Sequence, residues 1–425
     1  MTESSRIEIR RRHRPIEATV VVPGSKSLTN RALVCAALAK DPSTLFNIAP
    51  GDDTTAMIAG LNSLGAHCVI HGDDVDIEAP IDRTGGDDVV VDANLAGTTG
   101  RFLTAVGAVR AGCTTVTGKR ALQQRPMAPL LDSLSSLGAL VTTLEQPGHL
   151  PVRVCAGYQT GHELTVRGDS SSQFVTALLL IAPLLVNGLK IRVTGSIVSE
   201  SYLTMTCSVM KDFGVHVDRI GPDLLEVRSQ HYQGRHFAVE PDASSASYPL
   251  AAAAIIGGSV TVPGIGASST QGDIEFIEIL RNMGCTVRRG ASELSVSRSP
   301  ESALSGIQVN MSSISDLVPT VAVVAMIAST PTQISGVGFI REKESDRLGD
   351  LATELRALGG VIEVTPDGLI IAPSQVHGGS IETHHDHRIA MALSLVGLAC
   401  DNVVINDCQV VSKSWPNFWT MLNAL

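Results

Sequence analysis

The fold becomes readable at Pro23-Gly24-Ser25-Lys26-Ser27-Leu28-Thr29-Asn30-Arg31. Its proline and glycine end an apolar, strand-like run from Thr19 to Val22, and an apolar helical pattern follows. Two hydroxyls and a lysine therefore stand at a predicted helix N-terminus, with an arginine one turn inside it. Main-chain N–H groups and the helix dipole favour an anion at such a position. The stretch thus predicts an anion site at the start of a buried helix.

This helix is one of six that open on a polar cluster and continue as a nearly uncharged, apolar run. The openings recur about every 70 to 74 residues, which indicates an internal repeat. A helix that is apolar on all faces has to be buried. The six predicted openings are Ser27, Gly97, Ser171, Asp242, Asp316 and Asp386.

A second pattern has a similar period and consists of an amphipathic helix, a glycine and a strand. A glycine in the left-handed conformation commonly ends a helix, and the strand-like residues that follow support this interpretation. Trp415 to Leu425 resembles a sixth such helix. The five helix-ending glycines are Gly65, Gly138, Gly214, Gly284 and Gly359.

The two patterns together predict an α/β fold with mixed sheets that cover six buried helices. Three openings precede Glu240 and three follow it, so we expect two pseudo-symmetric domains of three repeats each. The first is expected at 24–240, and the second at 1–23 plus 241–425. The two crossings, at 22–24 and 239–242, would form a hinge, and clefts between domains are favoured ligand sites.

Composition limits the possible partners of the 425-residue chain. Its net charge of −10 argues against nucleic acid or a membrane surface as a partner. No apolar run reaches the roughly 18 residues that span a bilayer. The 8 cysteines are scattered singly, which predicts reduced thiols in a cytoplasmic protein rather than a disulfide or zinc framework. The histidines of 384–387 do not have the spacing of a metal site, so no metal is expected.

Positive charge is concentrated at the repeat openings, although the chain as a whole is acidic. Arginine binds phosphate and carboxylate groups bidentately, and lysine acts as a point charge that can also transfer a proton. Because buried unpaired cations are costly, they need an anionic ligand or carboxylate partners. The pattern favours small substrates with several anionic groups. For the run Arg341 to Arg347, a solvated and self-paired charge cluster is the alternative interpretation.

These motifs together resemble the 5-enolpyruvylshikimate-3-phosphate synthase family, the 3-phosphoshikimate 1-carboxyvinyltransferases. The resemblance spans essentially the whole chain. It rests on 23–31, Ala96-Gly97-Thr98 with Arg101, Arg125-Pro126, Ser171-Ser172-Gln173, 242–246, Asp316, 343–347, Asp386-His387-Arg388 and Lys413.

The resemblance implies two domains, each of three βαβαββ-type units with buried parallel helices, that close over the substrates. It implies transfer of the enolpyruvyl group of phosphoenolpyruvate to the 5-hydroxyl of shikimate 3-phosphate, with release of phosphate through a tetrahedral intermediate. No metal or organic cofactor is implied, and we expect a cytoplasmic monomer of aromatic amino-acid biosynthesis.

The resemblance also implies which residues bind each substrate. Shikimate 3-phosphate would be held by Lys26, Ser27, Arg31, Ser171, Ser172, Gln173, Ser199, Tyr202, Asp316 and Lys343. Phosphoenolpyruvate would be held by Lys26, Gly97, Arg125, Gln173, Arg347, Arg388 and Lys413. The catalytic, proton-transferring residues would be Asp316, Glu344 and Lys26. The chemistry needs such groups, because the hydroxyl loses a proton as it attacks C2 and C3 gains one.

Four positions depart from the family pattern. Leu95 stands where many members have Asn, and Phe102 replaces a common proline. Glu200 replaces a frequent lysine, with Arg192 as a possible substitute, and Phe339 replaces an Asn that often contacts the sugar-like ring. We expect altered affinity or glyphosate response rather than loss of the reaction.

Two alternatives remain open. A UDP-N-acetylglucosamine enolpyruvyl transferase would carry a cysteine in the loop before Arg125-Pro126, where this chain has none, and Asn in place of Ser27. An inactive phosphometabolite-binding homologue would be expected to lack a proton-transfer carboxylate or a phosphoenolpyruvate-binding cation, and this chain lacks neither.

Overall fold

The computed structural model describes residues 5–157, 161–169, 171–195 and 197–425. The chain divides into two compact units, which we call the first unit (Gly24–Val239) and the second unit (Met1–Pro23 with Glu240–Leu425). Each unit has its own cluster of buried apolar side chains.

The described part of the first unit contains three four-stranded sheets with the same arrangement. In each sheet a parallel pair is followed by an antiparallel neighbour and then by that neighbour's hairpin partner. The repeated order shows that each repeat folds as the same supersecondary unit. The strands are, in spatial order, β14 (His236–Ala238), β3 (Ser43–Phe46), β5 (Asp74–Ala79) and β4 (His67–His71); β6 (Val89–Asp92), β7 (Cys113–Thr117), β9 (Val152–Cys155) and β8 (Leu140–Thr143); and β10 (Glu163–Arg167), β11 (Leu189–Thr194), β13 (Leu224–Val227) and β12 (Asp218–Ile220).

Two sheets of the described second unit repeat this arrangement, and its third sheet has three strands, with β1 in the place of the antiparallel neighbour. The N-terminal strands complete two of the three sheets. β2 pairs in parallel with β15, and β1 pairs antiparallel with β23. The N-terminal residues therefore belong to the second unit through main-chain hydrogen bonds. The strands are β2 (Ile16–Thr19), β15 (Gly258–Pro263), β17 (Glu293–Arg298) and β16 (Thr286–Arg289); β18 (Gln308–Asn310), β19 (Thr332–Ser335), β21 (Gly368–Ala372) and β20 (Val361–Thr365); and β22 (Gly379–Ile381), β23 (Val403–Asn406) and β1 (Arg6–Ile9).

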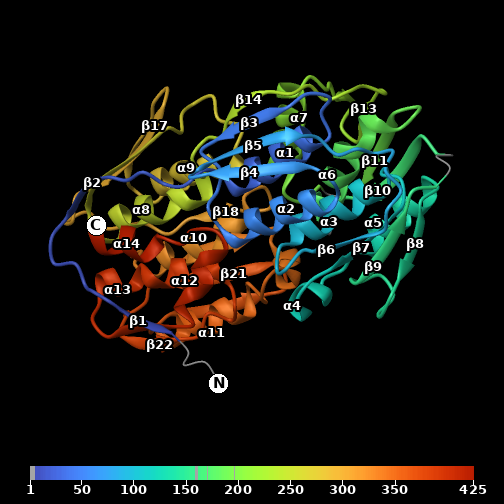
Figure 1. The fold of residues 1–425 in the computed structure, drawn as a ribbon. Coiled ribbons are helices and arrows are strands. Elements are labelled where there is room, and N and C mark those ends of the chain that lie inside the picture. Colours follow the sequence, from blue (N-terminus) through green and yellow to red (C-terminus); the bar gives the residue numbers. More distant parts are fainter. Residues whose placement is uncertain (1–4, 158–160, 170, 196) are drawn as a thin grey trace. The chain divides into compact units, whose positions relative to one another are not determined.

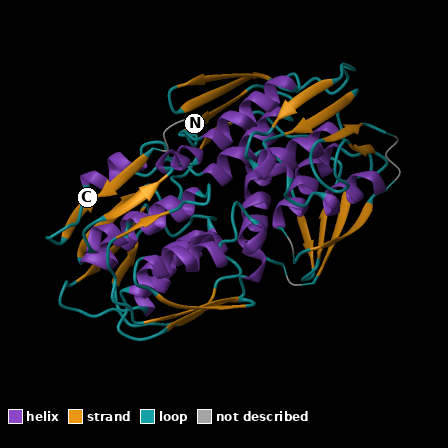
Figure 2. Ribbon diagram, turned by 90° about the horizontal axis from the view of Figure 1, so that it is seen from below, coloured by secondary structure: helices purple, strands orange, loops and turns teal. Residues whose placement is uncertain are grey.

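The inner helices of each unit are enclosed, as their apolar sequences predict. In the second unit α8 contacts β15 and β17, α10 contacts β21, and α12 contacts β23. Figures 1 and 2 show helices covered by strands within each unit. Burial of the Val-, Ala- and Leu-rich faces is the main source of stability for such helices. The inner helices are α1 (Lys26–Ala37), α3 (Gly97–Gly107), α6 (Ser172–Ile181), α8 (Ala243–Ile256), α10 (Val318–Met326), α12 (His387–Ser394) and the short α13 (Val396–Ala399).

The five predicted helix-ending glycines all have positive φ, from 84° at Gly214 to 106° at Gly284. Each directly follows the C-cap of a helix and precedes a hairpin strand, so this prediction is confirmed. The left-handed conformation is cheap for glycine because it has no Cβ. The outer helices are α2 (Asp52–Ser63), α4 (Arg120–Gln123), α5 (Ala128–Ser136), α7 (Glu200–Asp212), α9 (Phe276–Asn282), α11 (Gly349–Ala357) and α14 (Phe418–Ala424).

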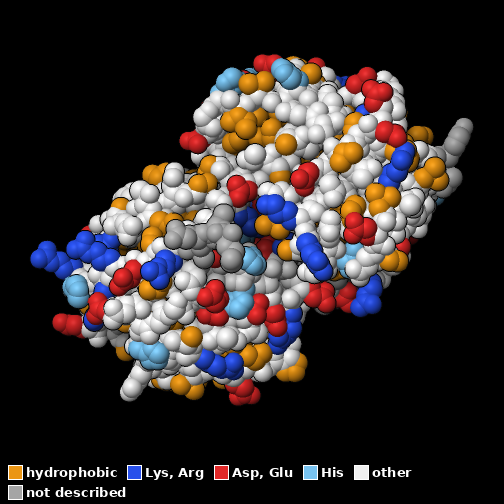
Figure 3. Space-filling model, turned by 60° about the horizontal axis from the view of Figure 1, so that its bottom comes forward, with side chains coloured by type: hydrophobic (Ala, Val, Ile, Leu, Met, Phe, Trp, Pro, Cys, Tyr) orange, Lys and Arg blue, Asp and Glu red, His pale blue; other side chains and the backbone are white. Residues whose placement is uncertain are grey.

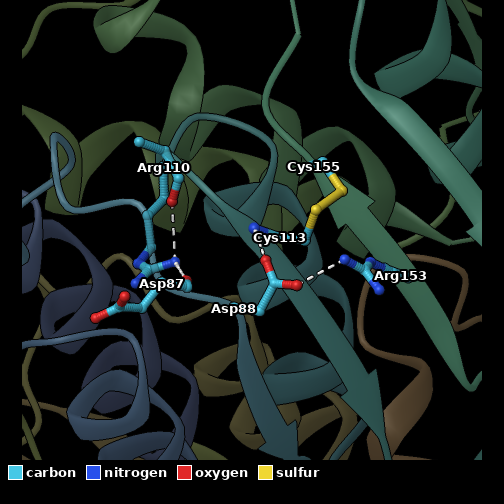
Figure 4. The surroundings of a disulfide bond; sticks show 7 residues. Asp87, Asp88, Arg110, Cys113, Arg153 and Cys155 are labelled. Atoms are coloured by element: carbon cyan, nitrogen blue, oxygen red, sulfur yellow. Dashed lines mark hydrogen bonds and ion pairs between the residues drawn. A yellow bond between two sulfur atoms is a disulfide. The ribbon is translucent and has the colours of Figure 1, made fainter.

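The expectation that all cysteines are reduced thiols is wrong for one pair. Cys113 and Cys155 form a disulfide across a sequence separation of 42. They face each other in register, at the start of β7 and the end of β9 (Figure 4). Asp88 accepts a hydrogen bond from the Cys113 main-chain N–H and pairs with Arg153 beside the disulfide. Spacing could not reveal the disulfide, because the register of two strands brings the cysteines together.

Two arginines of the N-terminal segment, Arg11 and Arg12, contact the C-terminal part of the chain. The Arg12 guanidinium donates to the main-chain carbonyls of Leu422 and Asn423, at the C-terminal end of α14, and Arg11 pairs with Asp401. A cation at a helix C-terminus satisfies carbonyls that have no partner within the helix. On the face drawn in Figure 3, Lys and Arg side chains lie among Asp and Glu side chains. No helix of the described residues is long and apolar enough to cross a membrane.

Candidate active site

The second unit gathers three cations around Asp316, which lies in the 3-10 helix η3 (Ser315–Leu317) before α10. Lys343 Nζ is 2.5 Å and Arg347 Nη1 2.9 Å from Asp316 Oδ1, and Arg388 Nη2 is 2.9 Å from Oδ2. Asp316 does not cap α10, as a simple helix opening would. Its carboxylate instead forms the centre of a charge cluster.

Arg347 is the most enclosed member of this cluster, with a side chain that is 1% exposed. Its Nε and Nη2 donate to Asp386 at 2.6 and 3.2 Å, and Nη2 also donates to Glu344 at 2.8 Å. Asp386 in turn caps α12 by accepting the Arg388 main-chain N–H at 2.9 Å. Arg347 therefore joins the segment 341–347 to the start of α12, while Arg341 pairs with Asp346 within the segment at 2.9 Å, so the self-paired interpretation is correct only for part of the run.

The charges of the cluster shift one another's pKa values. Burial raises the pKa of Asp316, but the positive charges of Arg388, Lys343 and Arg347 outweigh it and hold the pKa well below its usual range. Burial lowers the pKa of Lys343, and Asp316 offsets only part of this effect. Asp316 is therefore ionised at neutral pH. An anion bound to these cations would offset their positive charge. The pKa of Asp316 would then rise, which would make it a stronger base.

Two neighbours orient Lys343. Its ammonium donates to Ser315 Oγ at 3.0 Å, and the Phe339 ring centroid lies 5.6 Å from Nζ. A cation over an aromatic face is attracted by the ring quadrupole. Phe339, one of the departures from the family pattern, therefore contacts a predicted substrate-binding residue.

Lys413 is the remaining predicted cation of the second unit. It ends the 3-10 helix η5 (Cys408–Lys413), is 7% exposed, and lies on an element that packs against α12.

The first unit holds Arg31 in a buried position, 1% exposed. Its Nε donates to Thr206 Oγ1 at 2.8 Å and its Nη1 to the Ser27 carbonyl at 2.8 Å. The rings of Phe102 and Tyr202 each lie with their centroid 5.7 Å from its guanidinium carbon. Burial lowers the pKa of Arg31 to about 10. Within the described part of the chain it forms no ion pair with a carboxylate, so its charge can be neutralised by an anionic ligand.

The start of α1 differs slightly from the prediction. Ser25, not Ser27, is the N-cap, and its hydroxyl accepts from the Leu28 main-chain N–H. Ser27 lies inside the first turn, where its carbonyl binds Arg31. Lys26 begins the helix and pairs with the buried Asp53 at 3.1 Å. Sequence analysis missed Asp53, although the acidic pair at the start of α2 was a visible signal.

A second group of the first unit surrounds Gly97, the first residue of α3. A Cβ at Gly97 would lie 3.2 Å from Arg125 Nη1 and 3.6 Å from both Arg101 Nη1 and Gln173 Oε1. Arg101 donates to Gln173 at 2.5 Å and lies over the ring of Phe174. The glycine thus lets two guanidinium groups approach a helix N-terminus closely, which suits an anion. Arg101 belongs to this group, although it was not among the predicted binding residues.

The predicted serines lie at helix starts. Ser171 caps α6 by accepting the Gln173 main-chain N–H, and Ser172 is the first helical residue. Ser199 precedes α7 in the left-handed conformation, with φ of 55°. Tyr202, in the first turn of α7, packs on Arg31.

Two more of the four departures from the family pattern, Glu200 and Phe102, are ion-paired or packed. Glu200 pairs with Arg219 at 2.5 Å, and Arg192 pairs with Asp223 at 2.8 Å. The partner of Arg192 therefore lies in the connection between β12 and β13. Phe102 packs against Arg31 in place of the common proline.

No group of three or more His, Cys, Asp or Glu in the described ranges could hold a metal ion. His384 contacts Glu354 at 2.7 Å and Asp350 at 3.7 Å, and His385 contacts Asp407 at 3.1 Å, so the two histidines have different carboxylate partners.

The chain is similar to known proteins over nearly its whole length. The family model described as EPSP synthase (3-phosphoshikimate 1-carboxyvinyltransferase) matches residues 11–422. The 3-phosphoshikimate 1-carboxyvinyltransferase of Methanoregula boonei is 40% identical over 96% of this chain and 97% of its own, and that of a Nostoc species is 39% identical over 96% of each. The structure of EPSP synthase from Acinetobacter baumannii superposes with a TM-score of 0.81 at 25% identity, over 99% of this chain and 98% of the other. With this agreement in sequence and fold, the chain belongs to the EPSP synthase family of 3-phosphoshikimate 1-carboxyvinyltransferases.

Proposed function

We propose that the chain transfers the enolpyruvyl group of phosphoenolpyruvate to the 5-hydroxyl of shikimate 3-phosphate. The hydroxyl oxygen attacks C2 while C3 accepts a proton, which gives a tetrahedral intermediate. Loss of a C3 proton and departure of phosphate from C2 then restore the double bond. The observation that carries the proposal is the ionised Asp316 with Lys343, Arg347 and Arg388 around it. A carboxylate base next to cations is what this chemistry requires.

The cations that we assign to phosphoenolpyruvate are Lys26, Arg125, Arg347, Arg388 and Lys413. Guanidinium groups match carboxylate and phosphate oxygens bidentately, and they stabilise the charge of the leaving phosphate. Gly97 and Gln173 would contribute a main-chain N–H and an amide beside Arg125.

We assign shikimate 3-phosphate to Ser27, Arg31, Ser171, Ser172, Ser199, Tyr202, Asp316 and Lys343, with Lys26 and Gln173 contacting both substrates. The support is that Arg31 is buried and has no carboxylate among its described ion-pair partners, so an anionic substrate would neutralise it. Hydroxyls at helix starts can donate to a phosphate oxygen, and the main-chain N–H groups beside them also favour an anion.

Proton transfer would involve Asp316, Glu344 and Lys26. Asp316 is a weak base while three cations surround it, and substrate anions bound to those cations would raise its pKa toward a useful value. Glu344 and Asp316 are both paired with Arg347, and Lys26 is paired with Asp53. Glu344 and Lys26 therefore each have an oppositely charged partner that stabilises their ionised form.

The test is phosphate release from phosphoenolpyruvate by the purified chain. We expect release that depends on shikimate 3-phosphate. Equal release with UDP-N-acetylglucosamine would favour the related sugar-nucleotide transferase, and none with either would favour an inactive homologue. Each of those outcomes would overturn the proposal.

We further propose that the chain acts as a cytoplasmic monomer, with the linkers at 22–24 and 239–242 serving as a hinge. Size-exclusion chromatography with light scattering tests the oligomeric state. Small-angle scattering with and without shikimate 3-phosphate tests the hinge. Trapping of free thiols in intact cells tests the compartment, because cytoplasmic reductants keep most disulfides open.

A further inference from the structure

A buried carboxylate outside the predicted site lies behind Arg388. Asp273, in the 3-10 helix η2 (Gly272–Glu275), is 5% exposed. The hydroxyl of Ser244, in the first turn of α8, donates to Asp273 Oδ2. Arg388 Nη2 donates to the same hydroxyl over a long 3.4 Å and to Asp316 Oδ2 at 2.9 Å. The contacts form one chain from Asp273 through Ser244 and Arg388 to Asp316.

A second contact fixes η2 against the start of α8. The amide of Gln271, 2% exposed, accepts the Ala243 main-chain N–H at 3.0 Å and donates to the Pro241 carbonyl at 2.8 Å. Ala243 and Ser244 are adjacent in the chain, and only Gly272 separates Gln271 from Asp273. The Ser244–Asp273 hydrogen bond is therefore built into a rigid junction rather than made by two mobile side chains.

We propose that Asp273 is a positioning residue that orients the Ser244 hydroxyl and thereby holds Arg388 in place for phosphoenolpyruvate. The proposal rests on the assignment of Arg388 to that substrate. A serine hydroxyl has one hydrogen and two lone pairs. An ionised Asp273 can only accept, so it takes that hydrogen and turns the lone pairs of Ser244 toward Arg388. A protonated Asp273 can instead donate to the Ser244 oxygen. The Ser244 hydrogen is then free to point at the Arg388 guanidinium, and because both groups are donors, no hydrogen bond forms between them.

The charges that face Asp273 set the pH range in which it changes its protonation state. Burial, together with the negative charges of Asp316 and Asp242, raises its pKa to about 6, against the opposing effects of Arg388 and the Ser244 hydrogen bond. Its Oδ1 has no hydrogen-bond partner among the described residues. The chain of hydrogen bonds from Asp273 through Ser244 to Arg388 is thus complete above about pH 6 and is lost below it.

The test is the KM for phosphoenolpyruvate, measured between pH 5 and 8 at saturating shikimate 3-phosphate. At pH 7.5 we expect Asp273→Asn and Ser244→Ala each to raise this KM about tenfold, the effect of losing one oriented hydrogen bond to a charged group. The double variant should be little worse than either single one, because the two residues act through one contact. We expect kcat to change less than KM.

The pH profile separates positioning from a merely structural role. The phosphate of the substrate titrates identically in every assay, so the readout is the ratio of variant to wild-type KM. This ratio should be about ten at pH 7.5 and approach one near pH 5, where wild-type Asp273 is itself protonated. Glu275→Gln makes the same chemical change on an exposed residue of the same 3-10 helix and should leave KM unchanged.

A ratio that stays constant across this pH range, or an unchanged KM in Ser244→Ala, would overturn the proposal. The wild-type assay at pH 7.5 reports separately on the proposed function. If wild type shows no release that depends on shikimate 3-phosphate, the function fails; if it does and the ratio is flat, only the role of Asp273 fails.

Discussion

Arg347 and Asp386 form an ion pair in which both side chains are enclosed, 1% and 0% exposed, with Nε 2.6 Å from Oδ2. Asp386 also caps α12 and accepts from Ser345 Oγ at 3.1 Å. One carboxylate thus joins the segment that carries Lys343 and Arg347 to the helix that carries Arg388.

Loss of this carboxylate should be costly. In Asp386→Ala the buried guanidinium loses its closest partner and α12 loses its cap, so we expect the free energy of unfolding to fall by about 3 kcal/mol. Denaturant unfolding measures it. The matched control is Asp401→Ala, which removes the exposed partner of Arg11 and should cost less than about 1 kcal/mol. Equal losses in the two variants would contradict the structural role of the pair.

Asp316→Asn should impair turnover more than binding. Removing the proposed base should lower kcat by a factor of about 100 or more, while the isosteric amide keeps the volume of the site. Steady-state kinetics with both substrates measure the effect. Glu342→Gln removes an exposed carboxylate next to Lys343 in the sequence and should leave kcat unchanged. An Asp316→Asn variant with wild-type kcat would exclude the proton-transfer role.

Arg31→Met should weaken shikimate 3-phosphate binding. A buried guanidinium that binds an anion contributes a charge-assisted hydrogen bond, so we expect the KM for this substrate to rise by about 10- to 100-fold. Arg110→Met is the control, because Arg110 is also buried in the first unit, at 5% exposed, but donates to the main-chain carbonyls of Leu64, Asp87 and Ala111. It should lower stability and leave that KM unchanged. A similar KM in both variants would argue against an anion at Arg31.

Asp273→Asn should increase stability at neutral pH. The pKa of Asp273 is raised to about 6 in the folded chain, so the native state binds its proton more tightly than the unfolded state. Stability from this group is present below its unfolded pKa and is lost as the pH rises through about 6. The amide avoids that loss, and we expect it to gain up to about 3 kcal/mol at pH 8.

Denaturant unfolding at pH 8 and pH 4 tests this sign, because the gain should vanish at pH 4. Asp316, whose folded pKa is depressed, has the opposite linkage: its contribution is present above its unfolded pKa and is lost in acid. A gain for Asp273→Asn that persists at pH 4 would mean that packing, not charge burial, causes it.

Reduction of the Cys113–Cys155 disulfide should lower thermal stability. In the chain-entropy account, closing a segment with a separation of 42 restricts the unfolded chain by about 4 kcal/mol. Thermal unfolding with and without a reductant measures this. The double variant Cys113→Ser/Cys155→Ser should unfold like the reduced protein and be insensitive to the reductant. A wild-type protein whose Tm does not respond to reductant would show that the disulfide is not formed in solution.

Much of the fold could be predicted because its signals are local. A glycine such as Gly284 ends a helix through its own backbone freedom, and an apolar helix such as α10 has to be buried wherever it packs. Helix starts were less certain: Ser25 rather than Ser27 caps α1, because the cap depends on one hydrogen bond of the folded backbone.

The site could be predicted only by residue type and place in the repeat. Motifs identified the cations, but their partners depend on which elements pack together. Asp273 and Asp53 escaped notice because a carboxylate near a helix start is most often a solvated capping residue. Their importance comes from being buried beside Ser244 and Lys26, and the spacing of residues along the sequence does not show this burial.

The sequence by itself determined the six-fold repeat, the buried helices and the set of charged residues at their starts, since periodicity and composition are properties of short segments. Only the tertiary structure decided which of these residues meet. Cys113 reaches Cys155 through strand register, and Arg347 reaches Asp386 through the packing of its segment against α12. The physical reason is that the strength of an ion pair and the pKa of a carboxylate depend on distance and burial, which packing alone sets.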